Sequence, residues 1–311
     1  MKKQRLPLGI EEEEGFPVSL LKSALQKSIR TNDVKRSLII ARSFLRKSPN
    51  QFFRRLPIII LEDVFLHKDF RKIVELAGLS ARKSFKLTKE IEFFALTIVE
   101  DLARAEIRDC SFYSYLNGYK NIEEIPYVEW ADLKKERREL VMAIKYREKM
   151  GCTWEDRRML SILTRIWSYR FSQPDLIKHY QVMSRPKIPT RKSYSNIPLS
   201  MTVNDIPLSA VDNHSSPLIT ILVSKPHVIR LIKQYYPDDT LSPEKRLTSI
   251  IWKLRSGVNH KTDYWTGETI DWFKSPYNTT PDADKERYEK IYAALEPEIN
   301  NIAIWFLEKN K

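Results

Sequence analysis

The stretch SALQKSIRTNDVKRSLIIARSFLRKSPNQFFRRLPIIILEDVFL, residues 23–66, decides the fold class of this chain. Apolar side chains at helical spacing, such as Leu21 and Leu25, begin just before it and continue through its first turns. Asn32 or Asp33 can then cap a second helix, because such side chains accept hydrogen bonds from the first free amides of a helix. The stretch therefore opens as a helical hairpin.

The run PIIIL at residues 57–61 is ambiguous on its own. Three adjacent isoleucines favour a strand, while the length and flanks of the run fit a buried helix equally well. Helical patterns recur in four further ranges, at residues 68–79, 87–108, 131–150 and 154–171. Beyond them, SPEK at residues 242–245 and TPDADKERYEK at residues 280–290 each open a helix. The sequence thus predicts a mainly α, multi-helix architecture with helical hairpins packed into one or two helical domains.

Four segments are expected along the chain. Residues 1–15, which contain four consecutive glutamates, read as a flexible acidic lead-in, and residues 16–175 as an N-terminal helical region that contains the hairpin. Residues 176–205 read as a basic, Pro-containing linker, because no acidic residue precedes Asp205 in it. Residues 206–311 form a C-terminal helical region with the candidate active site.

The charge of the chain points to a polyanionic partner. There are 53 Lys and Arg against 40 Asp and Glu, a net charge of +13, and 11% of the residues are aromatic. A basic surface that serves solubility is the alternative. Cys110 and Cys152 lack a metal-like spacing, so neither a disulfide framework nor a metal site is expected. Without a long apolar run or a signal-like start, the protein is expected in the cytoplasm and not in a membrane.

The opening stretch also carries a resemblance to a known family. Its elements are a helix start at residues 23–30, a charged turn at residues 32–36, an aromatic residue followed by RRL at residues 52–56, and then Glu62 with Asp63. In this order they resemble the helical C-terminal region of clamp-loader-like AAA+ ATPases, the RarA, MgsA and WRNIP family. The resemblance implies work on DNA, and it leaves a homo-oligomer open, since that region supports oligomer contacts in the family.

The motor of that family has no counterpart in this sequence. A phosphate-binding Walker A loop needs the pattern GxxxxGK[ST], and none of the seven glycines stands in it. We therefore expect no nucleoside triphosphate and no other cofactor.

Charged residues border the apolar run of the opening stretch. Arg54 and Arg55 precede it, while Glu62 and Asp63 follow it. Because a buried charge without a partner is too costly to keep, a structural ion-pair network is the favoured interpretation. DNA contact by the arginines is the alternative, and catalysis by the two carboxylates is the least favoured.

A polar island lies between hydrophobic flanks in the C-terminal region. Asp212 and His214, two residues apart, can share acid and base duties in catalysis. The alternative is a helix cap, in which Asp212, Asn213 or Ser215 accepts hydrogen bonds from the first amides of the helix that starts at Pro217.

A second polar set follows in SIIWKLRSGVNHKTDYW, residues 249–265. The spacing predicts Trp252, Arg255 and Asn259 on one face of a helix, where Trp252 could stack on a base and Arg255 could hold a phosphate. A core tryptophan beside an arginine that extends to solvent is the alternative. The remaining candidates for this nucleic-acid pocket are His260, Lys261 and Tyr264. In the linker, the expected phosphate contacts are Arg185, Lys187, Arg191 and Lys192.

Three functional hypotheses follow from these patterns. The leading one is a base-excising hydrolase of the DNA glycosylase type, acting without ATP or metal on a flipped base, with Asp212 and His214 as catalytic residues. Such an enzyme could serve DNA repair or antiviral defence. The second is a non-catalytic DNA-binding or assembly module. The third is a nuclease, which is less favoured because no set of spaced carboxylates suits Mg²⁺.

Overall fold

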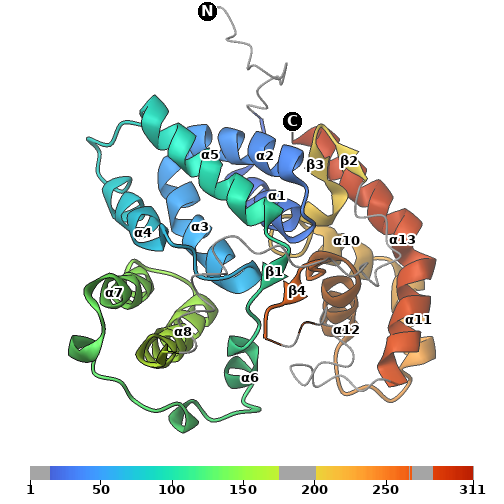
Figure 1. The fold of residues 1–311 in the computed structure, drawn as a ribbon. Coiled ribbons are helices and arrows are strands. Elements are labelled where there is room, and N and C mark those ends of the chain that lie inside the picture. The colour runs from blue at the N-terminus through green and yellow to red at the C-terminus, as the bar shows by residue number, and fades with distance from the viewer. Residues whose placement is uncertain (1–14, 175–200, 266, 268–282, 311) are drawn as a thin grey trace, which may run out of the picture.

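The computed structural model describes residues 15–174, 201–265, 267 and 283–310 (Figure 1). Within these residues the chain forms twelve α-helices and two small sheets of two strands each. The predicted mainly α, multi-helix architecture is therefore confirmed.

The chain opens with the expected hairpin of α1 (Val18–Arg30) and α2 (Val34–Lys47). Asp33 caps α2, since its carboxylate accepts a hydrogen bond from the amide of Arg36 at 3.0 Å. Asn32 turns the chain between the helices with a left-handed backbone (φ 58°), a conformation that asparagine tolerates better than most residues.

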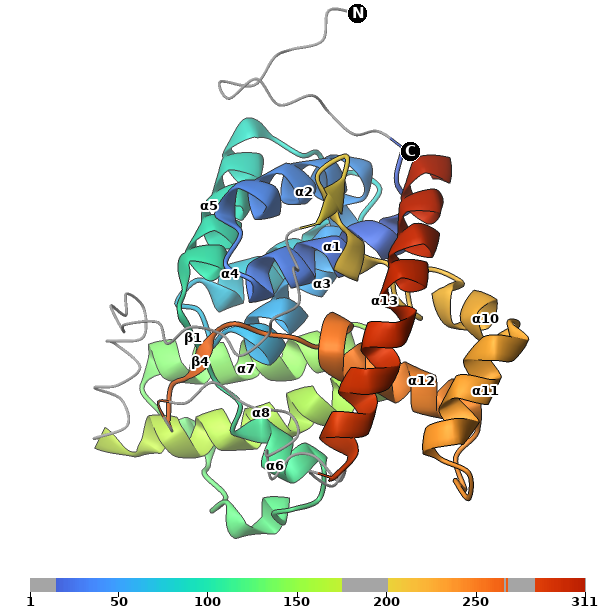
Figure 2. The ribbon, with the colours of Figure 1, turned by 90° about the vertical axis from the view of Figure 1, so that its right-hand side faces the viewer.

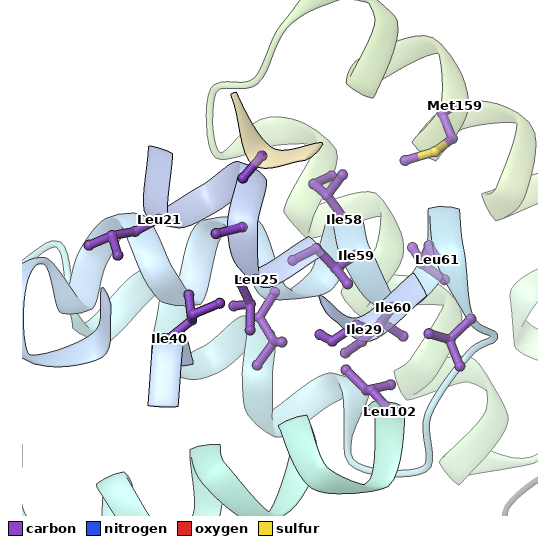
Figure 3. Packing of buried hydrophobic residues seen from close by; sticks show 14 of the residues in the cluster. Leu21, Leu25, Ile29, Ile40, Ile58, Ile59, Ile60, Leu61, Leu102 and Met159 are labelled. Atoms are coloured by element: carbon purple, nitrogen blue, oxygen red, sulfur yellow. The ribbon is translucent and has the colours of Figure 1, made fainter. Parts of the chain in front are cut away.

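The ambiguous run lies in a helix, α3 (Pro49–Asp63). Ile58, Ile59 and Ile60 point to different sides of α3, and all three are fully buried. The segment of α3 at residues 56–61 is apolar on every side, and such a segment must be enclosed by other elements. Figure 3 shows these isoleucines among Leu and Ile side chains of α1 and Leu102.

Five more helices complete the N-terminal region. They are α4 (Phe70–Leu79), α5 (Lys89–Arg104), α6 (Phe112–Leu116), α7 (Lys135–Lys149) and α8 (Trp154–Ser172). The predicted helix over residues 87–108 is too long: α5 ends at Arg104, and Ile107 with Arg108 forms strand β1. The reason is tertiary, because β1 pairs with a strand 155 residues further along the chain.

The C-terminal region carries shorter elements around one long helix. Strands β2 (Thr202–Val203) and β3 (Ile206–Pro207) form an antiparallel pair. The helices are α10 (Leu218–Val223), α11 (Pro226–Tyr235), α12 (Pro243–Ile251) and α13 (Ala283–Lys309). Ser242 caps α12 through a 3.3 Å hydrogen bond from the amide of Lys245. In Figure 2, α13 runs down the side of the molecule that faces the viewer, with α10, α11 and α12 beside it.

The predicted helix face of Trp252, Arg255 and Asn259 is wrong. After α12 the chain makes one wider π-helical turn, Trp252–Ser256, which ends where the amide of Gly257 donates to the carbonyl of Trp252 at 2.7 Å. A Cβ at Gly257 would lie 2.9 Å from the Trp252 ring, so glycine allows this close approach. Asn259 lies beyond the helix, in irregular backbone.

Both regions contribute to one buried hydrophobic cluster. Strand β4 (Thr262–Asp263) also reaches into the N-terminal region and pairs in parallel with β1, with Ile107 opposite Thr262 (Figure 2). No helix in the described ranges is long and apolar enough to cross a membrane.

The packing of α3 predicts a large loss of stability on truncation. Ile59→Ala should lower the free energy of unfolding by about 2–5 kcal/mol, because it removes buried methyl groups and leaves a cavity. Urea unfolding followed by circular dichroism measures the change. Thr97→Ala on the exposed face of α5 is the control and should stay within about 0.5 kcal/mol; equal losses in both variants would contradict the enclosed position of α3.

Candidate functional site

A polar face of α1 is buried against α3. Lys22 donates a hydrogen bond to Gln51 Oε1 at 2.7 Å. One turn further along both helices, Arg55 donates to Gln26 Oε1. The second contact lies four residues after the first on both helices, so α1 and α3 run in the same direction where they meet.

The end of α3 supplies the carboxylates for this face. Gln26 donates through Nε2 to Asp63 Oδ2 at 2.6 Å and to Glu62 Oε2 at 3.0 Å. Arg30 pairs with Asp63 through Nε and with Glu62 at 3.4 Å. Burial opposes the charge of Arg30, but Asp63 and Glu62 raise the pKa of its guanidinium. Glu62 and Asp63 thus bind mainly to residues of α1, and less to Arg54 and Arg55 earlier in α3.

The predicted ion-pair network is therefore divided. Arg55 lies 3.7 Å from Glu62 and 3.8 Å from Asp156. Arg54 instead donates to the backbone carbonyl of Gly151. The main partner of both predicted carboxylates is Arg30, which the network interpretation did not include.

The same face of α1 also holds the C-terminal region. Arg30 donates through Nη1 to the carbonyl of Ser256 at 3.0 Å, and its guanidinium lies 5.7 Å from the centre of the Trp252 ring. One turn earlier, Lys27 forms a buried ion pair with Asp212. The polar residues of the opening stretch thus connect α1 to α3 on one side and to the C-terminal region on the other.

Asp212 has no free hydrogen-bonding position. Its Oδ2 accepts from Lys27 and from the hydroxyl of Ser23, and its Oδ1 accepts from the amides of His214 and Ser215 at 2.9 and 3.1 Å. The hydroxyl of Ser215 lies 3.1 Å from Oδ1 as well, but its one proton has a nearer acceptor in the carbonyl of Ala210 at 2.5 Å. The side chain closes the polar island into a turn and is 3% exposed.

This environment is unfavourable for general-base chemistry at Asp212. Burial alone would raise the pKa of the carboxyl, but the ammonium of Lys27 and the amide of His214 hold it below its ordinary value. A base with a lowered pKa and no open lone pair is a weak acceptor of a proton from water. The side chain of His214 is exposed, and the contact between the two residues is the backbone amide of His214.

The cap alternative fits part of this geometry. Asp212 satisfies amides of its own turn, while the amide of Leu218 at the start of α10 donates to the hydroxyl of Ser216 at 3.3 Å. Pro217, the residue before α10, provides no side-chain cap.

The predicted pocket residues of the C-terminal region lie mostly inside the protein. Arg255 donates to the carbonyl of Leu208 and to the amide oxygen of Asn300, each at 2.7 Å. Asn259 donates to the carbonyl of Asp63 at 3.2 Å. His260 is half-buried and its backbone amide donates to the carbonyl of Arg30.

Lys261 is the most enclosed of these residues, with 0% exposure. Its ammonium donates to Asn32 Oδ1 at 2.6 Å, to the carbonyl of Leu102 at 2.9 Å and to that of Ala105. Burial lowers the pKa of Lys261 to about 7. The three acceptors favour the charged form, because an ammonium has three N–H donors and a neutral amine has two. Lys261 therefore links the last carbonyls of α5 to Asn32 in the turn after α1.

Another buried pair, not expected from the sequence, supports the strand joint. Asp109, next to β1, binds Arg170 of α8 and accepts a 3.0 Å hydrogen bond from the indole of Trp265. The guanidinium of Arg170 also lies 4.2 Å from the centre of the Trp265 ring. Tyr264, half-buried, donates its backbone amide to the carbonyl of Arg108. Tyr264, a predicted pocket residue, and its neighbour Trp265 thus make their contacts within the protein itself.

A basic surface with an exposed aromatic residue lies elsewhere, on the connection from α4 to α5. Its four cations are Arg82, Lys83, Lys86 and Lys89. All four are exposed, and among the described residues none of them forms an ion pair. Phe93, one helical turn after Lys89, is 74% exposed. We call these five residues the 82–93 surface; Figure 1 shows the connection at the outer edge of the molecule.

The sequence contains the signal for this surface, which the pattern analysis did not use. The segment SARKSFKLTK, residues 80–89, holds four basic residues and no acidic one. The imbalance extends to its region: residues 15–174 carry 31 Lys and Arg against 20 Asp and Glu, whereas the described residues after 200 carry 12 of each. The excess positive charge of the described chain thus belongs to the N-terminal region.

Arg185, Lys187, Arg191 and Lys192 lie outside the described residues, so their predicted role stays a prediction. Within the described ranges, no three His, Cys, Asp or Glu side chains are grouped so that they could hold a metal ion. Comparisons with protein families, characterised proteins and solved structures identify no similar protein. Functional inference therefore starts from the residues themselves.

The ion pair of Lys27 and Asp212 predicts the effect of neutralising the acid. Asp212→Asn keeps an oxygen for the turn amides but leaves a buried ammonium without its counter-charge, so the free energy of unfolding should fall by about 3–5 kcal/mol at pH 7. Because the folded pKa of Asp212 is lowered, its stabilisation is present above the ordinary carboxyl pKa and is lost as pH falls through the folded value.

Urea unfolding at several pH values between neutral and acidic measures both effects. The variant should lose less stability on acidification than the wild type. His214→Ala is the control and should change the free energy of unfolding by no more than about 0.5 kcal/mol, since its ring is exposed. An Asp212→Asn protein as stable as the wild type would show that the pair does not join the regions.

Proposed function

We propose that the protein binds DNA through the 82–93 surface, as a non-catalytic binding or assembly module. The observation that supports this is the group of four exposed cations without ion-pair partners in the described chain, next to an exposed phenylalanine. The other polar candidates of the described residues are largely occupied by internal contacts.

The composition of the surface fits a nucleic-acid backbone. Of the four cations, Lys89 has a carboxylate beside it, Glu90, whose pKa it helps to lower. Arg82, Lys83 and Lys86 have no acidic neighbour in sequence. Such cations can replace the counterions condensed on phosphates, and the release of those ions favours binding. Phe93 offers an aromatic face on which a base can stack, as in proteins that bind single strands. Single-stranded DNA, or a duplex with unpaired segments, is therefore the favoured ligand. The choice of DNA rests on the resemblance of residues 23–66 to the RarA-type family.

The base-excising hypothesis remains a prediction with less support. It requires a carboxylate that can activate water, and Asp212 accepts four hydrogen bonds and has a lowered pKa. Incubating the protein with modified and unmodified duplexes without metal, followed by alkali, tests it directly. Alkali-dependent strand breaks indicate base removal, chelator-sensitive direct breaks indicate a nuclease, and binding without product supports the module.

Charge reversal on the 82–93 surface tests the proposed phosphate contacts. Lys83→Glu with Lys86→Glu should weaken binding to an oligothymidine strand and reduce the slope of log affinity against log salt by about 1.4 if both lysines contact phosphate, at about 0.7 per contact for single strands. Fluorescence anisotropy over a salt series measures both quantities. Arg230→Glu with Lys233→Glu on α11 is the matched control, because both side chains are exposed, lie three residues apart like Lys83 and Lys86, and form no ion pair among the described residues. An unchanged slope in the first variant, or an equal change in the control, would refute the proposed surface.

The role of Phe93 is tested separately from charge. Phe93→Ala should weaken binding of the same strand by about 1–3 kcal/mol, the range for base stacking on an aromatic side chain. The salt slope should stay unchanged, because no phosphate contact is removed. Phe93→Trp should retain the affinity. If Phe93→Ala binds like the wild type, the aromatic residue takes no part in recognition.

A further inference from the structure

Four cations gather between α1, α3 and the turn before α8, away from the C-terminal region. They are Lys22, Arg54, Arg55 and Arg147, which we call the four-cation cluster. The side chain of Arg147, from α7, donates twice to the backbone carbonyl of Arg54, at 3.0 and 2.7 Å. Arg54 in turn donates to the carbonyl of Gly151. Neutral backbone oxygens therefore hold two of the four cations in place.

Carboxylates do not balance this cluster. Asp156 lies 3.8 Å from Arg55 in the first turn of α8. Glu62 lies 3.7 Å from Arg55, but it also pairs with Arg30 of the α1 face. Two carboxylates, both next to Arg55, thus face four cations, and one of the two is shared with Arg30.

The like charges act on one another across the cluster. The pKa of Lys22 is lowered by burial and by the nearby guanidinium groups of Arg55 and Arg54. The pKa of Arg147 is lowered first by burial, and Arg54 and Arg55 lower it further. Bringing an anion to the cluster would relieve this repulsion at Lys22 and Arg147.

A hydrogen-bond donor in the cluster also lacks an acceptor. Nη1 of Arg147 has no partner, although the residue is only 3% exposed. A buried guanidinium nitrogen without an acceptor is unfavourable, and a charged oxygen would satisfy it. Charge and hydrogen bonding therefore indicate the same kind of ligand.

We propose that the four-cation cluster is a binding site for a phosphate group. A phosphate carries the negative charge that the cluster lacks, and arginine side chains recognise its oxygens in a planar, bidentate geometry. Lys22, Arg54 and Arg55 are half-buried, so the ligand can reach them from solvent, while the buried Arg147 adds its positive charge to the site. This site is independent of the 82–93 surface.

Titration of the full chain with orthophosphate at constant ionic strength tests the proposal. Isothermal calorimetry in a chloride buffer should show saturable binding of one phosphate per chain. Lys22→Gln should weaken it about tenfold, the effect of losing one charge-assisted contact, and Arg54→Gln should weaken it by a similar factor. Lys233→Gln, on the distant helix α11, should bind like the wild type. Non-saturable heats, or equal affinities in all four proteins, would overturn the site.

A second arm distinguishes free phosphate from a phosphorylated ligand. Deoxythymidine monophosphate and unphosphorylated thymidine are titrated under the same conditions. Tighter binding of the monophosphate than of orthophosphate, with the same loss in Lys22→Gln, assigns the site to a phosphorylated ligand; equal affinities assign it to free phosphate. Thymidine should not bind. Equal binding of thymidine and the monophosphate would overturn phosphate recognition, whatever happens at the 82–93 surface.

Discussion

The buried polar face of α1 is the constraint on which the rest of the structure depends. A helix can enclose Gln26, Lys27 and Arg30 only if acceptors surround them on every side, since an unpaired charge in the interior is far less stable than one in water. The end of α3 supplies two carboxylates, and the C-terminal region supplies Asp212 and a backbone carbonyl. Neither source is sufficient alone, so the position of α1 fixes the positions of both.

This constraint also separates the polar residues of the chain by function. Gln26, Lys27 and Arg30 of α1 and the polar residues of the Asp212 turn are occupied inside the protein, where they hold the elements together. The cations of the 82–93 surface lie outside and have no ion-pair partners in the described chain. A chemically rich sequence motif is thus not a guide to a ligand site when the fold uses its members for its own contacts, whereas an unremarkable basic loop can remain available.

Local signals in the sequence predicted local structure well. The cap at Asp33 and the start of α12 at Ser242 each depend on residues within one turn of each other, so their pattern is complete in a short segment. The long-range pairs were not predictable: Lys27 and Asp212 are 185 residues apart. The π-helical turn was missed because a common face assumes 3.6 residues per turn. The cations of the 82–93 surface could be found from the sequence, because residues 80–89 hold four basic residues and no acidic one.

The parallel pair of β1 and β4 has a consequence for how the chain acquires its structure. The partner of Ile107 is Thr262, and the neighbouring Lys261 donates hydrogen bonds to the carbonyls at the end of α5. A nascent chain emerges from its amino end, so the first five helices leave the ribosome well before these partners are synthesised. The buried charges of α1 and the end of α5 stay hydrated until then. Completion of the N-terminal region is therefore a late, cooperative event that waits for synthesis of the chain to pass β4.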